Sequence, residues 1–209
     1  MLEYDTKAVV LSKKTIGESD AQVVLYTELL GKIELIARGL KKPTAKLSHH
    51  LESINLINAS LVAVNHKHLT SALATKTFPN LRKNELALSI ALRSLEILQE
   101  GIISPERDEF LWQELISFLD DLEEISTKKN DRLILSRSLY FLSRLVQALG
   151  LLPDSIDDLK NDLSLKGKAV LRQLVSIENF NDFNQDTLIN GVYNEVEPFF
   201  KKLILQAHN

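Results

Sequence analysis

The first third of the chain alternates apolar and polar positions with a period of two. Apolar side chains occupy every second position of the segment 31–37, namely Ile33, Leu35 and Ala37, as in a strand with one buried face. Four further segments are rich in β-branched and apolar residues: 7–11, 21–27, 54–64 and 69–78. Glycine and polar turn residues separate these segments, so the pattern predicts about five strands before residue 80.

After Phe78-Pro79 the apolar spacing becomes helical. Leucines recur three and four residues apart in the segment 85–99 and again in 131–149, where Gly150 and Pro153 end the pattern. Between them, Ser104-Pro105 supplies an N-cap and a first-turn proline for a helix ending near the polar run 126–130. Shorter helices are expected from Ser155 and Ser164, and a last helix over about 186–207, which Pro198 should kink or divide.

These periods predict an α+β protein of two domains, an N-terminal β-barrel over 1–79 and an all-α helical domain over 80–209. Five strands with a short helix or loop after the third, here the helix-compatible segment 46–53, match the layout of an OB-fold. A small SH3-like barrel remains the alternative, because periodicity does not separate the two.

Composition limits the class of protein. The chain has 209 residues, of which 44% are hydrophobic and 25% charged, and it contains no cysteine, which excludes disulfides, thiolate catalysis and cysteine-ligated metals. No apolar run approaches the ~18 residues of a membrane helix, and the N-terminus lacks the layout of a signal peptide. We therefore expect a cytosolic protein without membrane contact.

Charge is distributed unevenly between the two predicted domains. The net charge is −3, yet residues 1–79 carry ten Lys and Arg against seven Asp and Glu, and residues 80–209 carry fifteen against twenty-one. The barrel is therefore the basic part of an acidic chain. Such a split suggests that the two domains have different partners.

The most basic element follows the third predicted strand. Arg38, Lys41, Lys42 and Lys46 lie within nine residues that contain no acid, and cations of this kind suit contacts to DNA phosphates. OB-folds bind oligonucleotides on strands two and three and through the 1–2 and 4–5 loops, which adds six candidates: Lys13, Lys14, Lys32, His66, Lys67 and His68. The alternative is a solvated loop whose lysines aid solubility.

Aromatic residues are scarce in the barrel segment, where only Tyr4, Tyr26 and Phe78 occur. Proteins that hold single strands by their bases stack them on aromatic rings. A barrel with so few rings is suited to holding the backbone and leaving base edges free, although a barrel that never meets DNA would look the same.

The chain resembles the RecO family of recombination mediators. The resemblance is carried, in order, by Val10-Leu11, Gly17-Glu-Ser-Asp20, Leu25-Tyr-Thr27, Gly31-Lys-Ile33, Ile36-Ala-Arg-Gly39 with the basic loop, Leu69–Phe78, and Leu142–Asp154. It implies an OB-fold, binding to single- and double-stranded DNA and annealing of complementary strands in the bacterial cytoplasm at the nucleoid. It also implies work with RecR to load RecA onto DNA coated by single-stranded-DNA-binding protein. Many members carry a four-cysteine zinc module after the position of Asp154, and this chain has Ser155-Ile-Asp-Asp-Leu-Lys there.

The resemblance further implies a site for the acidic C-terminal tail of single-stranded-DNA-binding protein. Arg137 and Arg144, seven residues apart on one helix face, are the candidates. The alternative is that both arginines pair with acids of a neighbouring helix, such as Asp120, Asp121 or Glu124.

No pattern supports catalysis or a cofactor. The chain lacks G-x-S-x-G, a phosphate-binding P-loop and H-E-x-x-H. His66 and His68 have no cysteine or convincing carboxylate near them to complete a metal site. We expect a non-enzyme without metal or cofactor, and two other hypotheses stay open: a protein-interaction adaptor of the same architecture, and an RNA-binding OB-fold.

Overall fold

A computed structural model gives the fold of residues 2–16, 18, 20–37, 48–63, 67–103, 106–128, 130–153, 155–156, 159, 162–184 and 191–206. By their contacts these residues form two compact units. The barrel unit comprises Met1–Pro79 and Ile102–Trp112, and the helical unit comprises Asn80–Gly101 and Gln113–Asn209.

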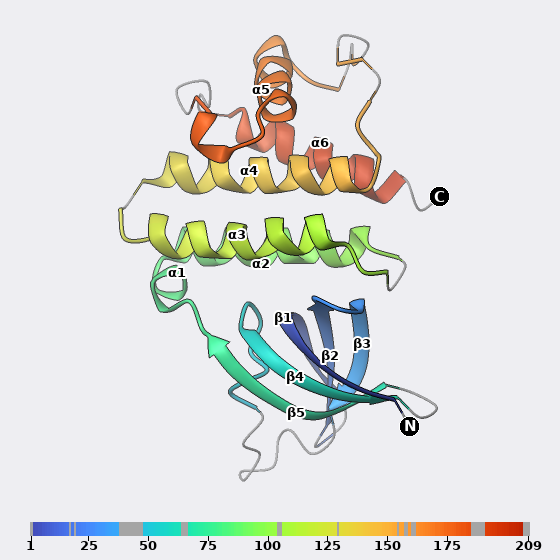
Figure 1. Ribbon diagram of the computed structural model, residues 1–209. Helices are drawn as coiled ribbons and strands as arrows, with labels where there is room; N and C mark the ends of the chain where they lie inside the picture. Colours follow the sequence, from blue (N-terminus) through green and yellow to red (C-terminus); the bar gives the residue numbers. More distant parts are fainter. Residues whose placement is uncertain are drawn as a thin grey trace. The chain divides into compact units, whose positions relative to one another are not determined.

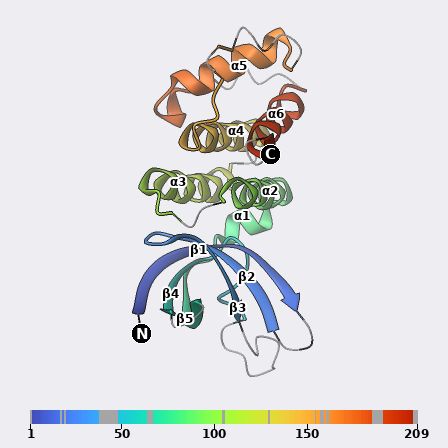
Figure 2. The same ribbon diagram turned by 90° about the vertical axis from the view of Figure 1, so that its right-hand side faces the viewer.

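The barrel unit holds five antiparallel strands: β1 (Leu2–Ile16), β2 (Asp20–Thr27), β3 (Gly31–Ala37), β4 (Leu56–Ala63) and β5 (Lys67–Lys76). Their hydrogen-bonded order is β3-β2-β1-β4-β5, and β3 also approaches β5, so the sheet curls into a small barrel (Figures 1 and 2). This is an OB-fold arrangement. The predicted fold class, an OB-fold followed by a helical domain, is confirmed.

Strand β1 is long enough to serve two neighbours. Residues Leu2–Val9 pair with β4, and residues Ala8–Ile16 pair with β2. The register with β2 shifts between Val10 and Ser12, and a bulge of this kind bends and twists a strand. The bend allows one strand to belong to both sides of the barrel.

Alternate side chains of the strands fill the barrel interior. Along β3 the burial follows the predicted alternation, with residues 33, 35 and 37 buried and residues 34 and 36 exposed. The core also contains Ala8, Val10, Val23, Leu25, Ile57, Leu61 and Ala72. Complete burial of a Val, Leu or Ile side chain contributes about 1.5–3 kcal/mol, so this face fixes the register of each strand.

The described residues after the basic loop form turns, the second of the two predicted alternatives, a short helix or a loop. Residues 48–54 are a series of turns whose Leu51 and Ile54 are fully buried. The Asn55 side chain donates to the carbonyl oxygens of His49 and His50, and His50 Nδ1 accepts from the backbone N–H of Ala74. These bonds attach the segment to the barrel without a helix.

Residues 102–112, here called the return segment, belong by their contacts to the barrel unit although they follow the first long helix. A Cβ added to Gly31, which has φ +63°, would lie 2.1 Å from the carbonyl oxygen of Glu106. The rings of Tyr26 and Trp112 lie 6.3 Å apart between centroids. Glycine is therefore required at position 31 both for its backbone conformation and for this close approach.

The helical unit is built from six α-helices and a short 3₁₀ turn: α1 (Pro79–Lys83), α2 (Glu85–Gly101), α3 (Glu109–Ile125), α4 (Asp131–Ala148), α5 (Leu165–Ser176), η1 (Phe180–Asp182) and α6 (Tyr193–Gln206). Figure 2 shows α2 and α3 side by side, with α4 and α6 forming the next layer and α5 beyond them. Stacked rings of Phe118 and Phe141, 4.4 Å apart, join α3 to α4.

Several helix ends differ from the predictions. The predicted start at Ser104-Pro105 lies outside the described residues; α3 begins at Glu109, and Asp108 Oδ1 accepts from the N–H of Leu111 as an N-cap does. The described residues between 151 and 163 form no helix, so the expected helix at Ser155 is absent from them. Helix α6 contains Pro198 without being divided.

Two other helix boundaries agree with the sequence. Ser164 caps α5 by accepting from the N–H of Gly167. Gly150, with φ +68°, ends α4 while the N–H of Leu151 bonds to the carbonyl of Val146, an arrangement typical of glycine after a helix.

Candidate nucleic-acid interface

The predicted DNA-binding residues of β1 lie where the basic loop leaves and rejoins the barrel. Lys14 pairs with Gln22 in β2, which in turn pairs with Ile36 in β3, one residue before the end of that strand. Lys13 Nζ donates to the backbone carbonyl of Ser48, where the described chain resumes, at 3.2 Å. The register therefore places Lys14 two strands from the end of β3, and Lys13 contacts the residue at which the described chain resumes after the loop.

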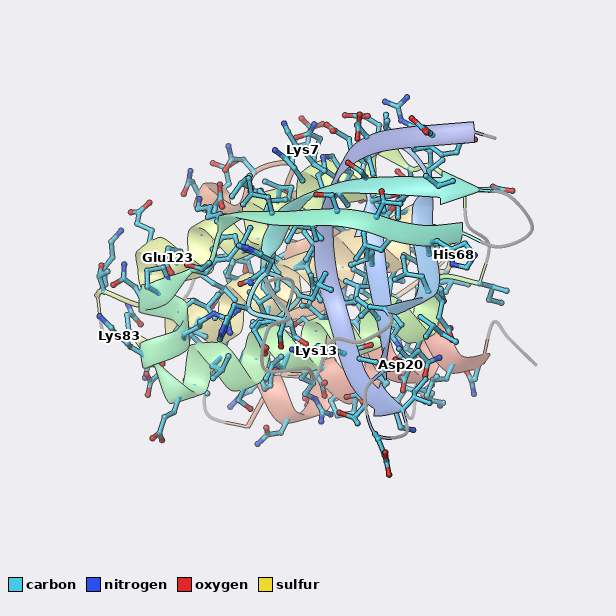
Figure 3. All side chains as sticks on the ribbon, turned by 90° about the horizontal axis from the view of Figure 1, so that it is seen from below. Lys7, Lys13, Asp20, His68, Lys83 and Glu123 are labelled. Atoms are coloured by element: carbon cyan, nitrogen blue, oxygen red, sulfur yellow. The ribbon has the colours of Figure 1, made fainter. Side chains whose placement is uncertain are left out.

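The two lysines differ in how exposed they are. Lys13 also forms an ion pair with Glu52, and its side chain is 21% exposed. Lys14 is exposed near the end of β1. Of this pair, Lys14 is better placed for a phosphate, whereas Lys13 also holds the segment 48–52 against the strand. Figure 3 shows Lys13 and Asp20, the first residue of β2, on one side of the barrel and Lys7 on another.

Four predicted cations, Arg38, Lys41, Lys42 and Lys46, lie outside the described residues. The same holds for His66 and for the side chain of Lys67, whose backbone opens β5. His68 is exposed on β5 opposite Val62. Val62 pairs in turn with Glu3, so His68 lies toward the start of β1, whereas Lys14 lies near the end of that strand. Figure 3 shows His68 and Asp20 at different places on the barrel.

Lys32 is directed to the return segment. Its ammonium group donates to the backbone carbonyl of Ile102, and the side chain is half-buried. Burial lowers the pKa of Lys32 from its usual value, and the nearby Glu34 carboxylate opposes that shift. Lys32 therefore joins the return segment to the barrel and does not lie at the flanks of the basic loop.

The rings of the barrel strands are mostly inside. Tyr26 and Phe78 are buried, and Tyr4 is half-buried. Burial raises the pKa of the Tyr26 hydroxyl above its usual value, and Asp108 adds to the shift. Among the described residues of 2–79, no tyrosine or phenylalanine ring is fully exposed for stacking on a base. This surface is suited to phosphate contacts.

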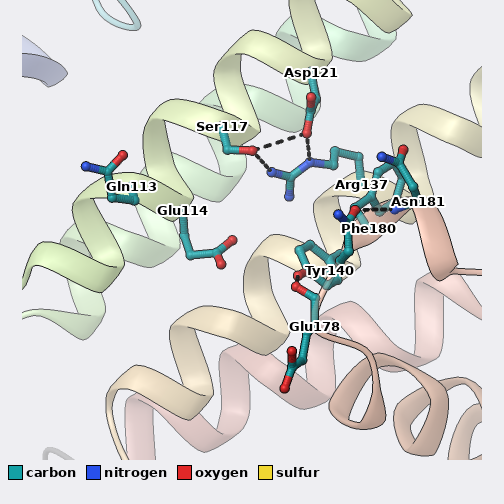
Figure 4. Close-up of a pocket in the computed structure, with 10 residues that line it drawn as sticks. Gln113, Glu114, Ser117, Asp121, Arg137, Tyr140, Glu178, Phe180 and Asn181 are labelled. Atoms are coloured by element: carbon teal, nitrogen blue, oxygen red, sulfur yellow. Dashed lines mark hydrogen bonds and ion pairs between the residues drawn. The ribbon is translucent and has the colours of Figure 1, made fainter.

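Arg137 lies inside the helical unit. Its side chain is 1% exposed, and Nε donates to Asp121 Oδ2 at 2.6 Å while Nη2 donates to Ser117 Oγ at 3.2 Å (Figure 4). The guanidinium carbon lies 5.5, 5.2 and 5.3 Å from the ring centroids of Phe118, Tyr140 and Phe180. Burial lowers the pKa of Arg137 from its usual value, and the charge of Asp121 opposes that shift.

Arg144 is also paired. Its Nε donates to Glu114 Oε1 at 3.0 Å and its Nη1 to Gln147 Oε1 at 2.8 Å. Both arginines thus contact acids of α3, and Asp121 is one of the acids named in the alternative. Carboxylates beside both guanidinium groups do not favour an acidic peptide. A partner tail at Arg137 and Arg144 stays a prediction that this geometry does not support.

Sequence reasoning missed the return segment and the burial of Arg137. A sequence signal for the second existed, because Arg137 lies three residues after Ile134 and four before Phe141, two apolar positions on the same helix face. The described residues contain no group of three His, Asp or Glu side chains placed to hold a metal. No helix in the described part of the chain combines the length and hydropathy of a membrane span.

Comparison with known proteins finds similarity to one family. Residues 1–77 match the family model described as Recombination protein O N terminal. A DNA repair protein RecO of Dehalococcoides mccartyi is 31% identical over 126 residues, covering 58% of this chain and 48% of the relative. The RecO proteins of Geobacter metallireducens (29% over 132 residues; 61% and 52%) and Syntrophobacter fumaroxidans (27% over 158 residues; 71% and 57%) are also similar.

The chain spans about half the length of the curated relatives it matches. The family-model match covers the strands of the barrel unit, and the matches to relatives extend into the helical unit. This chain is therefore similar to the RecO family, by a family model over residues 1–77 and by RecO proteins that match 58% to 71% of its length.

Proposed function

We propose that this protein is a non-catalytic mediator of DNA repair that binds single- and double-stranded DNA through its OB-fold and anneals complementary strands. The observation that carries the proposal is that Lys13 contacts the residue at which the described chain resumes after the loop 38–47, which holds four cations, and that Lys14 lies two strands from the end of β3. The names of the relatives support a role in DNA repair.

The binding surface consists of Lys14, Arg38, Lys41, Lys42 and Lys46, with Lys13 holding the returning chain. Phosphate contacts made by such cations release condensed counterions, so binding weakens as salt rises. The buried rings Tyr26 and Phe78 support a grip on the backbone that leaves base edges unoccupied. A strand held in this way remains able to pair with its complement.

The proposed partners rest on the similarity to RecO proteins. We propose that the protein acts with RecR to load RecA onto DNA covered by single-stranded-DNA-binding protein, and that it contacts the acidic tail of the latter. Because Arg137 and Arg144 are paired with carboxylates, we do not assign the tail to them. This contact would be supported if the wild-type protein binds a tail peptide and does not bind the same peptide without its acidic residues.

Salt dependence tests the DNA surface. Fluorescence anisotropy of a labelled oligonucleotide is measured from low to high salt for the wild type and for Lys41→Gln/Lys42→Gln. On single strands each lost phosphate contact should lower the slope of log K against log salt by about 0.7. Lys7→Gln is the matched control, because Lys7 is exposed on β1 away from the loop flanks. No DNA binding by the wild type at low salt would contradict the proposal and favour a protein-interaction adaptor.

A further inference from the structure

The helical unit contains a pocket beside Arg137, between α3, α4 and the turn at η1. Its volume is about 430 Å³, which is within the range of small-molecule sites. Arg137, Glu114, Tyr140 and Phe180 are among the residues that line it (Figure 4). We call it the Arg137 pocket.

The pocket contains an unused hydrogen-bond donor. Arg137 Nη1 is buried and has no hydrogen-bond partner among the residues that the structure describes, while Nε and Nη2 are occupied by Asp121 and Ser117. Figure 4 shows Nη1 directed to the space between Glu114 and Tyr140. A buried donor on a charged group is costly to leave unpaired, so this nitrogen points to a ligand with an acceptor oxygen.

An acceptor faces the same space. The Glu114 side chain is 15% exposed, and its Oε1 accepts from Arg144 Nε. Figure 4 shows the Glu114 carboxylate turned toward Arg137 and Tyr140. The pocket thus presents an N–H donor and a carboxylate acceptor to one ligand, and together they match an edge on which a carbonyl lies next to an N–H.

The charge of the pocket selects a neutral ligand. Arg137 is paired with Asp121, and Arg144 with Glu114, so the two ion pairs compensate one another. Glu178 adds a further acid to the lining. An anion gains no net attraction here and a phosphate is repelled, whereas a neutral group meets both hydrogen-bonding atoms without bringing charge.

The shape of the lining selects a flat ligand. Tyr140 and Phe180, whose ring centroids lie 5.7 Å apart, both line the pocket and both lie against the Arg137 guanidinium. Aromatic side chains bind flat heterocycles by stacking. A ring that enters beside them would bring its polar edge to Arg137 and Glu114.

From these contacts we propose that the Arg137 pocket binds a nucleobase with a lactam edge, that is, a ring carbonyl adjacent to a ring N–H. The carbonyl accepts from Arg137 Nη1 and the ring N–H donates to Glu114. Guanine, hypoxanthine, thymine and uracil present this edge, and adenine and cytosine do not. The proposal does not depend on DNA contact by the barrel unit.

Inosine and adenosine are the matched probes, because they differ only at this edge. Each is titrated into the full-length protein labelled with ¹⁵N, and the Nε–H signal of Arg137 is followed by NMR. We expect inosine to shift that signal with a dissociation constant on the order of 1 mM or tighter, and adenosine to bind at least roughly tenfold more weakly. 1-Methylinosine, which lacks the ring N–H, should behave like adenosine.

Protein variants test the two contacts separately. Glu114→Ala should weaken inosine binding by roughly tenfold or more. Glu124→Ala is the matched control, because Glu124 lies on the same helix, is 71% exposed and pairs with Lys128. Arg137→Lys retains a cation for Asp121 and removes the unused donor, and it should also lose inosine binding. Circular dichroism verifies that each variant is folded.

The base can come from a free nucleoside or from an unpaired base of a DNA strand. Thymidine and a short oligo-dT distinguish these sources: competition by oligo-dT at the Arg137 signal identifies a strand, and a response to thymidine alone identifies a nucleoside. Failure of inosine to bind, equal affinity for adenosine, or undiminished binding by Glu114→Ala in the folded protein each overturns the proposal.

Discussion

Asp121→Ala should destabilise the helical unit by leaving the Arg137 cation buried without its carboxylate. Arg137 is 1% exposed, and its 2.6 Å bond to Asp121 is charge-assisted. Removing one partner of a fully buried pair costs about 3–5 kcal/mol. Asp121 itself is 38% exposed, so water can enter the space it leaves. We therefore expect a loss of about 2–3 kcal/mol.

Urea unfolding followed by circular dichroism at 222 nm measures this loss, since helices dominate that signal. With a slope of about 2 kcal/mol per molar urea, the midpoint should fall by roughly 1 M. Glu124→Ala on the same helix is the control, because its side chain is exposed to solvent. Arg137→Met in the Asp121→Ala background should recover part of the stability, since no unpaired charge then remains. A loss below about 0.5 kcal/mol, or additive single-variant effects, would refute the reasoning.

Three further outcomes follow from the contacts of single residues. Gly31→Ala should lower the unfolding midpoint more than Gly150→Ala, because both glycines have positive φ but only the Cβ at 31 would meet backbone, that of Glu106; equal effects would contradict this. Ser164→Ala should lower the free energy of unfolding in urea by about 1 kcal/mol through loss of the α5 N-cap. Ser164→Thr should keep most of that stability. Burial raises the pKa of Tyr26 in the folded protein, so above pH 10.0, the usual pKa of tyrosine, the folded protein keeps a proton that the unfolded chain releases. The free energy of unfolding should therefore fall as pH rises above 10.0. Thermal unfolding measured against pH should show a smaller fall for Tyr26→Phe.

The barrel was predictable because its signals are local. The alternation of Ile33, Leu35 and Ala37 and the glycine at position 31 define β3 without reference to any distant residue. The return segment was not predictable in this way, because its contacts join Lys32 to Ile102 and Tyr26 to Trp112 across about 70 to 86 positions. Such pairings depend on the folded topology.

The helical unit shows a second limit of pattern reasoning. The apolar stripe predicted for α4 was too narrow, because Ile134, Phe141 and Leu145 are also fully buried. The predicted stripe consisted of Leu135, Leu139, Leu142, Val146 and Leu149. Arg137 was predicted to bind a partner tail, with pairing to an acid such as Asp121 as the alternative, and the structure shows that pairing with Arg137 buried. Buried ion pairs require two elements to meet, and a single sequence does not state which acid supplies the partner.

The helix ends show that capping signals compete. Ser104-Pro105 and Asp108 both satisfy the sequence requirements for a helix start, and the structure uses Asp108. The N-cap Asp108 lies within the return segment, whose residues up to Trp112 belong to the barrel unit.

The central claim is that cations beside the end of β3 hold DNA backbones while bases remain able to pair. The most direct test is the annealing rate of two complementary oligonucleotides, one labelled with a donor and the other with an acceptor dye. We expect the wild type and Lys7→Gln to accelerate annealing over protein-free controls, and Lys41→Gln/Lys42→Gln to lose most of that acceleration with its fold intact by circular dichroism. No acceleration by the wild type, or full acceleration by the double variant, would contradict the account.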